Sequence, residues 1–323
     1  MNTARSNESS VFTKKQHMKK IYLSALIALT GLLDVQAQQD PHYTQYMYNM
    51  NVINPAYAGS KENLSLGMLY RKQWVNMDGA PSTFTLSGHS PVGNKVGVGL
   101  SVISDKIGPV NENNIYGDFS YTLDLGGEHK LAMGIKAGAT LHKLGAHSDI
   151  NSSLRDGTDP SFATDLNSAY FNIGSGLFYY TNKYYLAVSM PNFMKAKHVS
   201  KDGLRIGNEV PHYFITGGYV FDLNPNLKFK PFALIKSAVG APVSVDASAN
   251  FLFNQKFEIG GTYRLEDSFG AMVNFAITPT LRIGYAYDHI VSELRAATPS
   301  SHEIIILYDV NLPKRVSRSA RYF

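Results

Sequence analysis

The residue combinations that most often carry chemistry are incomplete in this sequence. Gly88-His89-Ser90 begins like the nucleophile elbow of a serine hydrolase, but that motif needs a glycine two residues after the serine, where this chain has Val92. His302-Glu303 lacks the second histidine of a zinc-protease helix. Gly97-Val98-Gly99 lacks the third glycine of a dinucleotide-binding loop. These patterns therefore predict neither hydrolytic nor nucleotide chemistry.

Thiol and metal chemistry have no better support. The 323-residue chain has no cysteine, which removes thiolate catalysis, disulfides and cysteine-based zinc sites together. Asp156, Asp159 and Asp165 cluster in one segment where carboxylates could bind calcium, but their spacing matches no calcium loop and favours a solvated loop. We expect no catalytic residue, no metal and no cofactor. A hydrolase site assembled in a barrel lumen from distant residues is the enzymatic alternative.

The start of the chain has the three regions of a secretory signal peptide. Met18-Lys19-Lys20 is followed by the apolar run Ile21 to Leu33 and by a small-residue cleavage site at Val35-Gln36-Ala37. The apolar run is too short for a spanning helix, which needs about 20 residues. We expect residues 1–37 to be a leader, with translation beginning at Met18 and the mature chain at Gln38.

Most of the basic charge belongs to this leader. The formal net charge of +5 falls to about +2 when the five basic and two acidic residues of positions 1–37 are removed. We therefore expect no nucleic-acid partner, because such proteins carry a clear basic excess. Charged residues make up only 17% of the chain, below the roughly 25% of soluble proteins, which suits a sheet that faces lipid.

Much of the mature chain alternates with the period of two that is typical of a β-strand. Val96, Val98, Leu100 and Val102 alternate with Gly97, Gly99 and Ser101. In other segments too, one face is apolar and the other carries Gly, Ser, Thr and isolated charges, as in a barrel lumen. We expect aspartate in place of Val98 or Leu100, which would face lipid, to impair assembly more than serine in place of Gly99, because the lumen face tolerates polarity. A soluble β-sandwich is the structural alternative.

Such segments predict about 14 strands. They lie at 62–70, 82–90, 95–104, 113–123, 129–141, 170–180, 184–190, 212–221, 227–236, 243–252, 257–263, 268–277, 281–288 and 303–310. Every second connection is a tight turn, such as Pro91 to Asn94, and the others are generally longer, such as His142 to Ala169. The predicted fold is all-β: a transmembrane, antiparallel, up-and-down barrel of the outer-membrane type, formed by residues 61–323 with a C-terminal tail and periplasmic termini.

Residues 38–60, QQDPHYTQYMYNMNVINPAYAGS, precede the first strand and are rich in Tyr, Asn and Met. The segment is too polar to span a membrane, yet its large side chains prefer burial. We expect it to dock into the lumen or onto the periplasmic rim, with a disordered periplasmic tail as the alternative. Because Asn54 precedes a proline and Gly59 is flexible, the sequence also predicts a fixed turn that presents Tyr57.

This segment resembles the opening of the mature PorP/SprF proteins of Bacteroidetes. The likeness rests on two blocks, Tyr43-Thr44-Gln45-Tyr46 and Asn54-Pro55-Ala56-Tyr57-Ala58-Gly59. Shorter likenesses cover the rest of the mature chain: Arg71 to Trp74, Asp159 to Phe162, Lys230 to Lys236, Gly284 to Asp288, Ser301 to Ile304 and Arg321 to Phe323.

The resemblance implies a non-enzymatic outer-membrane barrel of the type IX secretion system, the route by which Bacteroidetes export surface proteins and gliding adhesins. The implied partners are a secreted cargo protein with a C-terminal sorting domain, components of the secretion and gliding machinery, and outer-membrane lipid. The candidate partner-binding residues are Tyr43, Gln45, Tyr46, Asn49, Asn54, Pro55, Tyr57, Gly59, Asp159 and Phe162.

The residues themselves leave a second function open, that of a substrate channel or porin-like transporter. In that case the segment 38–60 and the long loops would act as plug and constriction, and lumen charges would set selectivity. The candidate lumen charges are Lys136, Lys228, Lys230, Lys236, Asp246 and Arg282.

Overall fold

A computed structural model describes residues 42–144, 166–194, 197–201, 204–208, 210–292, 298 and 300–310. The predicted leader and the C-terminal tail beyond Val310 lie outside these residues. No helix in the described part of the chain is long and apolar enough to cross a membrane.

Strands dominate the described residues. They are β1 (Leu64–Lys72), β2 (Ser82–Val92), β3 (Val96–Ile107), β4 (Val110–Gly126), β5 (His129–Leu144), β6 (Leu166–Tyr180), β7 (Tyr184–Met190), β8 (Lys197–Lys201), β9 (Leu204–Asn208), β10 (His212–Tyr219), β11 (Phe221–Asn224), β12 (Leu227–Ala238), β13 (Ser244–Phe253), β14 (Phe257–Arg264), β15 (Ser268–Ala276), β16 (Leu281–Ile290) and β17 (Ser300–Val310).

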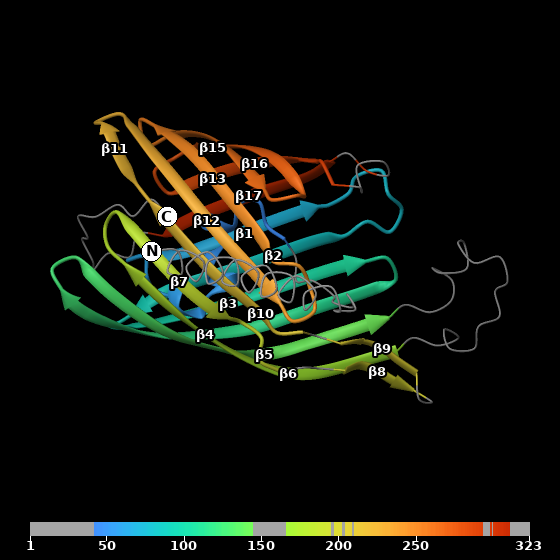
Figure 1. Cartoon of the computed structure of the whole chain (residues 1–323). Coiled ribbons are helices and arrows are strands. Elements are labelled where there is room, and N and C mark those ends of the chain that lie inside the picture. The colour runs from blue at the N-terminus through green and yellow to red at the C-terminus, as the bar shows by residue number, and fades with distance from the viewer. Residues whose placement is uncertain are drawn as a thin grey trace, which may run out of the picture. The chain divides into compact units, whose positions relative to one another are not determined.

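All of these strands except β8 and β9 close into one antiparallel barrel (Figure 1). Strand β1 pairs with both β2 and β17, and β10 pairs with both β7 and β12, so the sheet has no end. Strands β10 and β11 flank Val220 and both pair with β12, so they act as one wall strand, and β8 and β9 form a separate two-stranded sheet. The wall therefore has 14 strands, which confirms the predicted fold class. Each predicted strand overlaps one wall strand.

The two rims differ in their connections. At the rim that we call the short-turn rim, β2–β3, β4–β5 and β6–β7 are joined by tight turns, as the sequence predicts. The opposite, long-loop rim is less uniform, because β3 and β4 meet in a tight turn at Gly108-Pro109. The alternation does not reveal this longer hairpin, because polar residues such as Asn111 and Glu112 continue its ladder.

Side-chain directions follow the predicted alternation. Leu100 and Ile135 are 57% and 60% exposed on the outer face, whereas Ser101 and Lys136 point into the lumen and are buried. An outer face of this kind suits the hydrocarbon of a bilayer, since lipid-facing and lumen-facing residues alternate in membrane barrels. The described core therefore lies inside the barrel.

Candidate functional site: a plugged lumen

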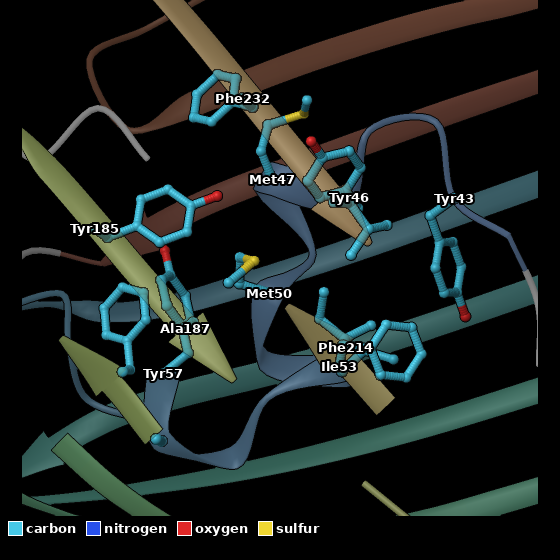
Figure 2. Close-up of a cluster of buried hydrophobic side chains, with 14 of the residues drawn as sticks. Tyr43, Tyr46, Met47, Met50, Ile53, Tyr57, Tyr185, Ala187, Phe214 and Phe232 are labelled. Carbon is cyan, nitrogen blue, oxygen red and sulfur yellow. The ribbon is translucent and has the colours of Figure 1, made fainter. Parts of the chain in front are cut away.

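Residues 42–60, which we call the plug, lie inside the barrel. The plug contains three short helices, η1 (Tyr46–Tyr48), α2 (Met50–Ile53) and η2 (Pro55–Tyr57). Asn54 begins η2 by accepting a hydrogen bond from the Ala56 amide at 2.9 Å through its side-chain oxygen, with proline at the first helical position. Figure 2 shows Met47, Met50 and Tyr57 among inward side chains of the wall, such as Tyr185 and Phe232. The plug thus supplies much of the core.

The plug runs through the lumen from the long-loop half to the short-turn half. Near the start of the plug, Thr44 accepts a hydrogen bond from Arg71, which lies one residue before the long-loop end of β1. At its end, the Gly59 amide donates to His89 Nδ1 at 3.2 Å, near the short-turn end of β2. His89 is therefore held by a backbone contact, in keeping with the incomplete hydrolase motif around it.

One side of the plug packs on glycines of β3 and β5. A Cβ atom at Gly97 would lie 2.1 Å from the Ala58 carbonyl oxygen, and one at Gly134 would lie 2.2 Å from the Ala56 amide nitrogen. Both distances are far below normal contact, so only glycine allows the plug backbone to approach the wall so closely. The Ser120 hydroxyl secures this side by donating to the Ala58 carbonyl at 2.6 Å.

Two further hydrogen bonds fix the same side to β6 and β7. The Asn54 amide group donates to the Leu177 carbonyl at 3.0 Å, and the Ser189 hydroxyl donates to the Ile53 carbonyl at 2.7 Å. The Tyr57 ring makes an edge contact with Phe178, with ring centroids 5.3 Å apart. The turn after Asn54 is therefore a fixed structure, but it presents Tyr57 to the barrel wall and not to solvent.

The other side of the plug is held by buried charges. Arg71 Nη2 lies 2.8 Å from Asp288 Oδ2 and its Nη1 lies 3.1 Å from Glu303 Oε2. The backbone amides of Thr44 and Gln45 donate to the two Glu303 oxygens at 2.9 and 2.8 Å. Because Arg71, Asp288 and Glu303 are almost fully buried, these bonds replace water that the charges have lost.

Two more ion pairs of the wall hydrogen-bond to the plug. Lys230 Nζ lies 2.9 Å from Glu258 and donates to the Tyr48 hydroxyl at 2.8 Å, while that hydroxyl itself donates to Glu258. Lys136 Nζ lies 2.7 Å from Asp118, whose other oxygen accepts from the Asn51 amide group at 3.3 Å. Each pair therefore has a plug side chain as its additional hydrogen-bond partner.

The sequence model of the family described as type IX secretion system membrane protein PorP/SprF matches residues 35–308. The chain belongs to this family. The match confirms the resemblance, and with the closed barrel it makes this PorP/SprF protein an outer-membrane β-barrel of the type IX secretion system. The family is one of secretion proteins and not a known class of enzymes. No curated protein matches the sequence.

Solved structures with a similar fold are outer-membrane proteins. The CymD monoaromatic hydrocarbon channel has 14% identity and a TM-score of 0.49, with 80% of this chain and 91% of that chain covered. The Ralstonia pickettii toluene transporter TbuX has 12% identity and a TM-score of 0.46, with 80% and 92% covered. The Acinetobacter baumannii outer membrane protein Omp33 has 12% identity and a TM-score of 0.43, with 78% and 100% covered.

Eight of the ten candidate partner-binding residues of this PorP/SprF protein lie in the plug. Seven are buried: Tyr43, Gln45, Tyr46, Asn49, Asn54, Pro55 and Tyr57. Gly59, the eighth, is half-buried and has a positive φ of 69°. Asp159 and Phe162 lie outside the described residues. The candidates of the plug therefore meet the wall of their own barrel.

Most of the predicted lumen charges also point inward. Lys136, Lys230, Lys236 and Asp246 are buried, and Asp246 is paired with Arg264 at 2.8 Å. The other two lie near the short-turn rim: Arg282 Nη1 lies 4.0 Å from the buried Glu258, and Lys228 pairs with the exposed Asp222.

Sequence reasoning missed the acidic and basic residues that grip the plug. These are Arg71, Asp118, Glu258, Asp288 and Glu303. The available signal was their position as isolated charges on the lumen face of otherwise apolar strands. The motif His302-Glu303 divides between the two faces of β17, because His302 contacts Tyr285 on the exposed face at 2.6 Å while Glu303 is buried.

Proposed function

We propose that this PorP/SprF protein is a non-enzymatic barrel that binds a secreted cargo protein through the cargo's C-terminal sorting domain, for its secretion, docking or surface anchoring. The observation that supports this proposal is the filled lumen. A lumen occupied by a segment of the same chain leaves the rim and the wall as the surfaces for a partner, and it gives them a rigid support.

A channel for substrates is less well supported by the same observation. Lys136 and Lys230 would set selectivity in such a channel, but each is buried and paired with a carboxylate. A charge that is neutralised in this way attracts few ions from water. The lumen charges therefore serve the plug better than they would serve transport.

The plug residues act indirectly in this proposal. The hydrogen bonds from Thr44 and Gln45 to Glu303, and the packing of Ala56 on Gly134, brace opposite sides of the wall from within. Such bracing fixes the relative positions of the wall strands, and a pre-organised surface binds a partner at a lower cost in conformational entropy. Gliding adhesins are the cargo class that the family resemblance favours.

Two measurements on the purified barrel test the function. In planar bilayers we expect no ion conductance, because the plug fills the lumen. In nanodiscs we expect saturable binding of a C-terminal sorting domain of a type IX cargo from the same genome, and no binding of a signal-free globular control. Steady conductance without binding would favour the channel and contradict the proposal.

In cells, deletion of the gene should abolish surface labelling of the cargo, and the wild-type gene should restore it. Normal cargo labelling in the deletion strain would contradict the proposed role.

A further inference from the structure

The barrel wall has a backbone edge on β6 near the long-loop rim. Strand β6 pairs with β5 along its full length, from Leu166 to Tyr180. On its other side it pairs with β7 only from Ser175 to Tyr180, where Ser175 lies opposite Met190. The nine residues of β6 nearest the long-loop rim, 166–174, therefore extend beyond the end of β7.

Pro191 explains why β7 stops. Proline has no amide hydrogen to donate to a ladder, and it is rare within paired strands. Pro191 and Asn192 turn inward and are buried, and the chain returns to β6 for one hydrogen bond, from the Phe193 amide to the Ile173 carbonyl at 2.8 Å. Strand β8 follows beside β6, but it pairs with β9 in a separate sheet. The edge thus results from the sequence of the β7 end.

The bond to Ile173 identifies which backbone groups face the edge. In an antiparallel ladder the amide and carbonyl of every second residue point to the same side. Since the Ile173 carbonyl points away from β5, the amides and carbonyls of Phe171, Ala169 and Asn167 do so as well. Within the described residues, none of these three has a backbone partner on that side.

Apolar side chains surround this edge. Phe171 and Ile173 are 56% and 41% exposed on its outer face, and Phe193 and Met194 are 38% and 45% exposed where the chain leaves β7. A free edge beside an apolar surface is a template for another strand, and in lipid its unpaired amides would be costly. Consecutive ladder groups at alternate residues are satisfied best by the backbone of another extended chain.

We propose that the β6 edge, residues 167–173, is where the barrel binds its cargo, by accepting an extended segment of the cargo's C-terminal domain as an additional β-strand. This inference rests on the proposed function and names its binding surface. The backbone ladder would provide affinity, and Phe171 and Ile173 would select apolar side chains on the outer face of the added strand.

Two alanine-to-proline variants test whether the edge is open. Ala169→Pro removes an amide that faces the edge, so the barrel should fold and keep its heat-modifiable gel mobility. Ala139→Pro is the matched control on β5, also exposed on the outer face. The register directs the Ala139 amide at Ile115 of β4, so this variant should fail to fold. Failure of both variants would overturn the proposal.

Binding then tests the occupant, with the cargo C-terminal domain as the probe on barrels in nanodiscs. Wild type and Ala169→Val, which keeps the amide, should bind alike, whereas Ala169→Pro should bind at least tenfold more weakly. Unchanged binding by folded Ala169→Pro would overturn the edge site but leave the proposed function intact. Absence of binding by wild type would overturn both.

Hydrogen exchange separates a partner from the chain's own loops. Amides of residues 167–171 that face the edge should exchange quickly in the free barrel and become protected when the cargo domain binds. Protection in the free monomer would show that the chain itself covers the edge, and protection only in a dimer would make a second copy the occupant. Either result would overturn the proposal.

Discussion

Replacement of Gly134 by alanine tests whether the plug is tightly seated. The new Cβ would lie 2.2 Å from the Ala56 amide nitrogen, and ordinary contact begins at 3.4 Å, so the plug must retreat by about 1.2 Å. The same retreat stretches the hydrogen bonds from Asn54 to Leu177 and from Ser189 to Ile53, now 3.0 and 2.7 Å, to about 4 Å.

The expected cost follows from these losses. Each lost hydrogen bond costs about 1 kcal/mol, and overpacking of a rigid core costs roughly 1–3 kcal/mol. Since part of the overpacking is relieved by the retreat, we expect Gly134→Ala to lower the free energy of unfolding by about 2–4 kcal/mol. The matched control is Gly117→Ala on β4, where a Cβ would meet no atom closer than 3.9 Å. Its effect should stay within about 0.5 kcal/mol.

Urea unfolding of the barrel in lipid vesicles measures both variants. Trp74 is the single tryptophan of the chain and lies in the connection after β1, so its fluorescence reports on the long-loop rim without added labels. Heat-modifiable gel mobility provides a second, independent measure of folding. If Gly134→Ala matches Gly117→Ala within 0.5 kcal/mol or so, the plug yields freely and the argument from close approach is wrong.

Further variants test the charges and the facing of the wall. Glu303→Ala leaves Arg71 and two plug amides without this acceptor and should lower the free energy of unfolding in urea by about 3–5 kcal/mol. Glu303→Gln should cost less, because one side-chain oxygen still accepts. Equal costs of the two variants would contradict this account. Lys230→Met should destabilise more than the double variant Lys230→Met with Glu258→Gln, since the double variant removes both members of the buried pair. A simple sum of the single effects in a double-mutant cycle would argue against coupling. Leu100→Asp should cost about 2 kcal/mol and reduce refolding into vesicles relative to Leu100→Ala, and equal yields would contradict the lipid-facing assignment.

The wall could be predicted from the sequence because a period of two determines facing directly. Val98 and Leu100 point to the outer face and Asp118 points to the lumen, as their alternation indicates. The number of strands follows from the same pattern. Facing is a local property, so one sequence contains enough information to assign it.

What fills the lumen could not be predicted in the same way. Alternation places Gly99 on the polar lumen face, and a Cβ there would lie 2.9 Å from Asn51 Oδ1 and 3.1 Å from Asp118 Oδ2. The tolerance of serine at Gly99 therefore depends on how far the Asn51 side chain can move, because alternation shows which side a residue takes and not what it meets there. Two adjacent tyrosines of β6 take opposite sides in the same way: Tyr179 faces outward, whereas Tyr180 is 3% exposed inside the lumen.

The charge cluster of Arg71, Asp288 and Glu303 depends on residues that are far apart in the sequence. Arg71 and Glu303 are 232 positions apart, and only the pairing of the first and last wall strands brings them together. Isolated charges on the lumen face were visible in the sequence, but their partners depend on closure of the barrel.

The position of the plug constrains the order of assembly. The plug continues directly into β1, and the barrel closes when β1 pairs with β17. Glu303, near the start of β17, binds Thr44 and Gln45 of the plug and Arg71 of β1 at once. Because the same residue makes the contacts to the plug and to β1, we expect seam closure and plug binding to be coupled in folding. On this expectation the wall closes around the plug, and β17 both completes the barrel and binds the plug inside it.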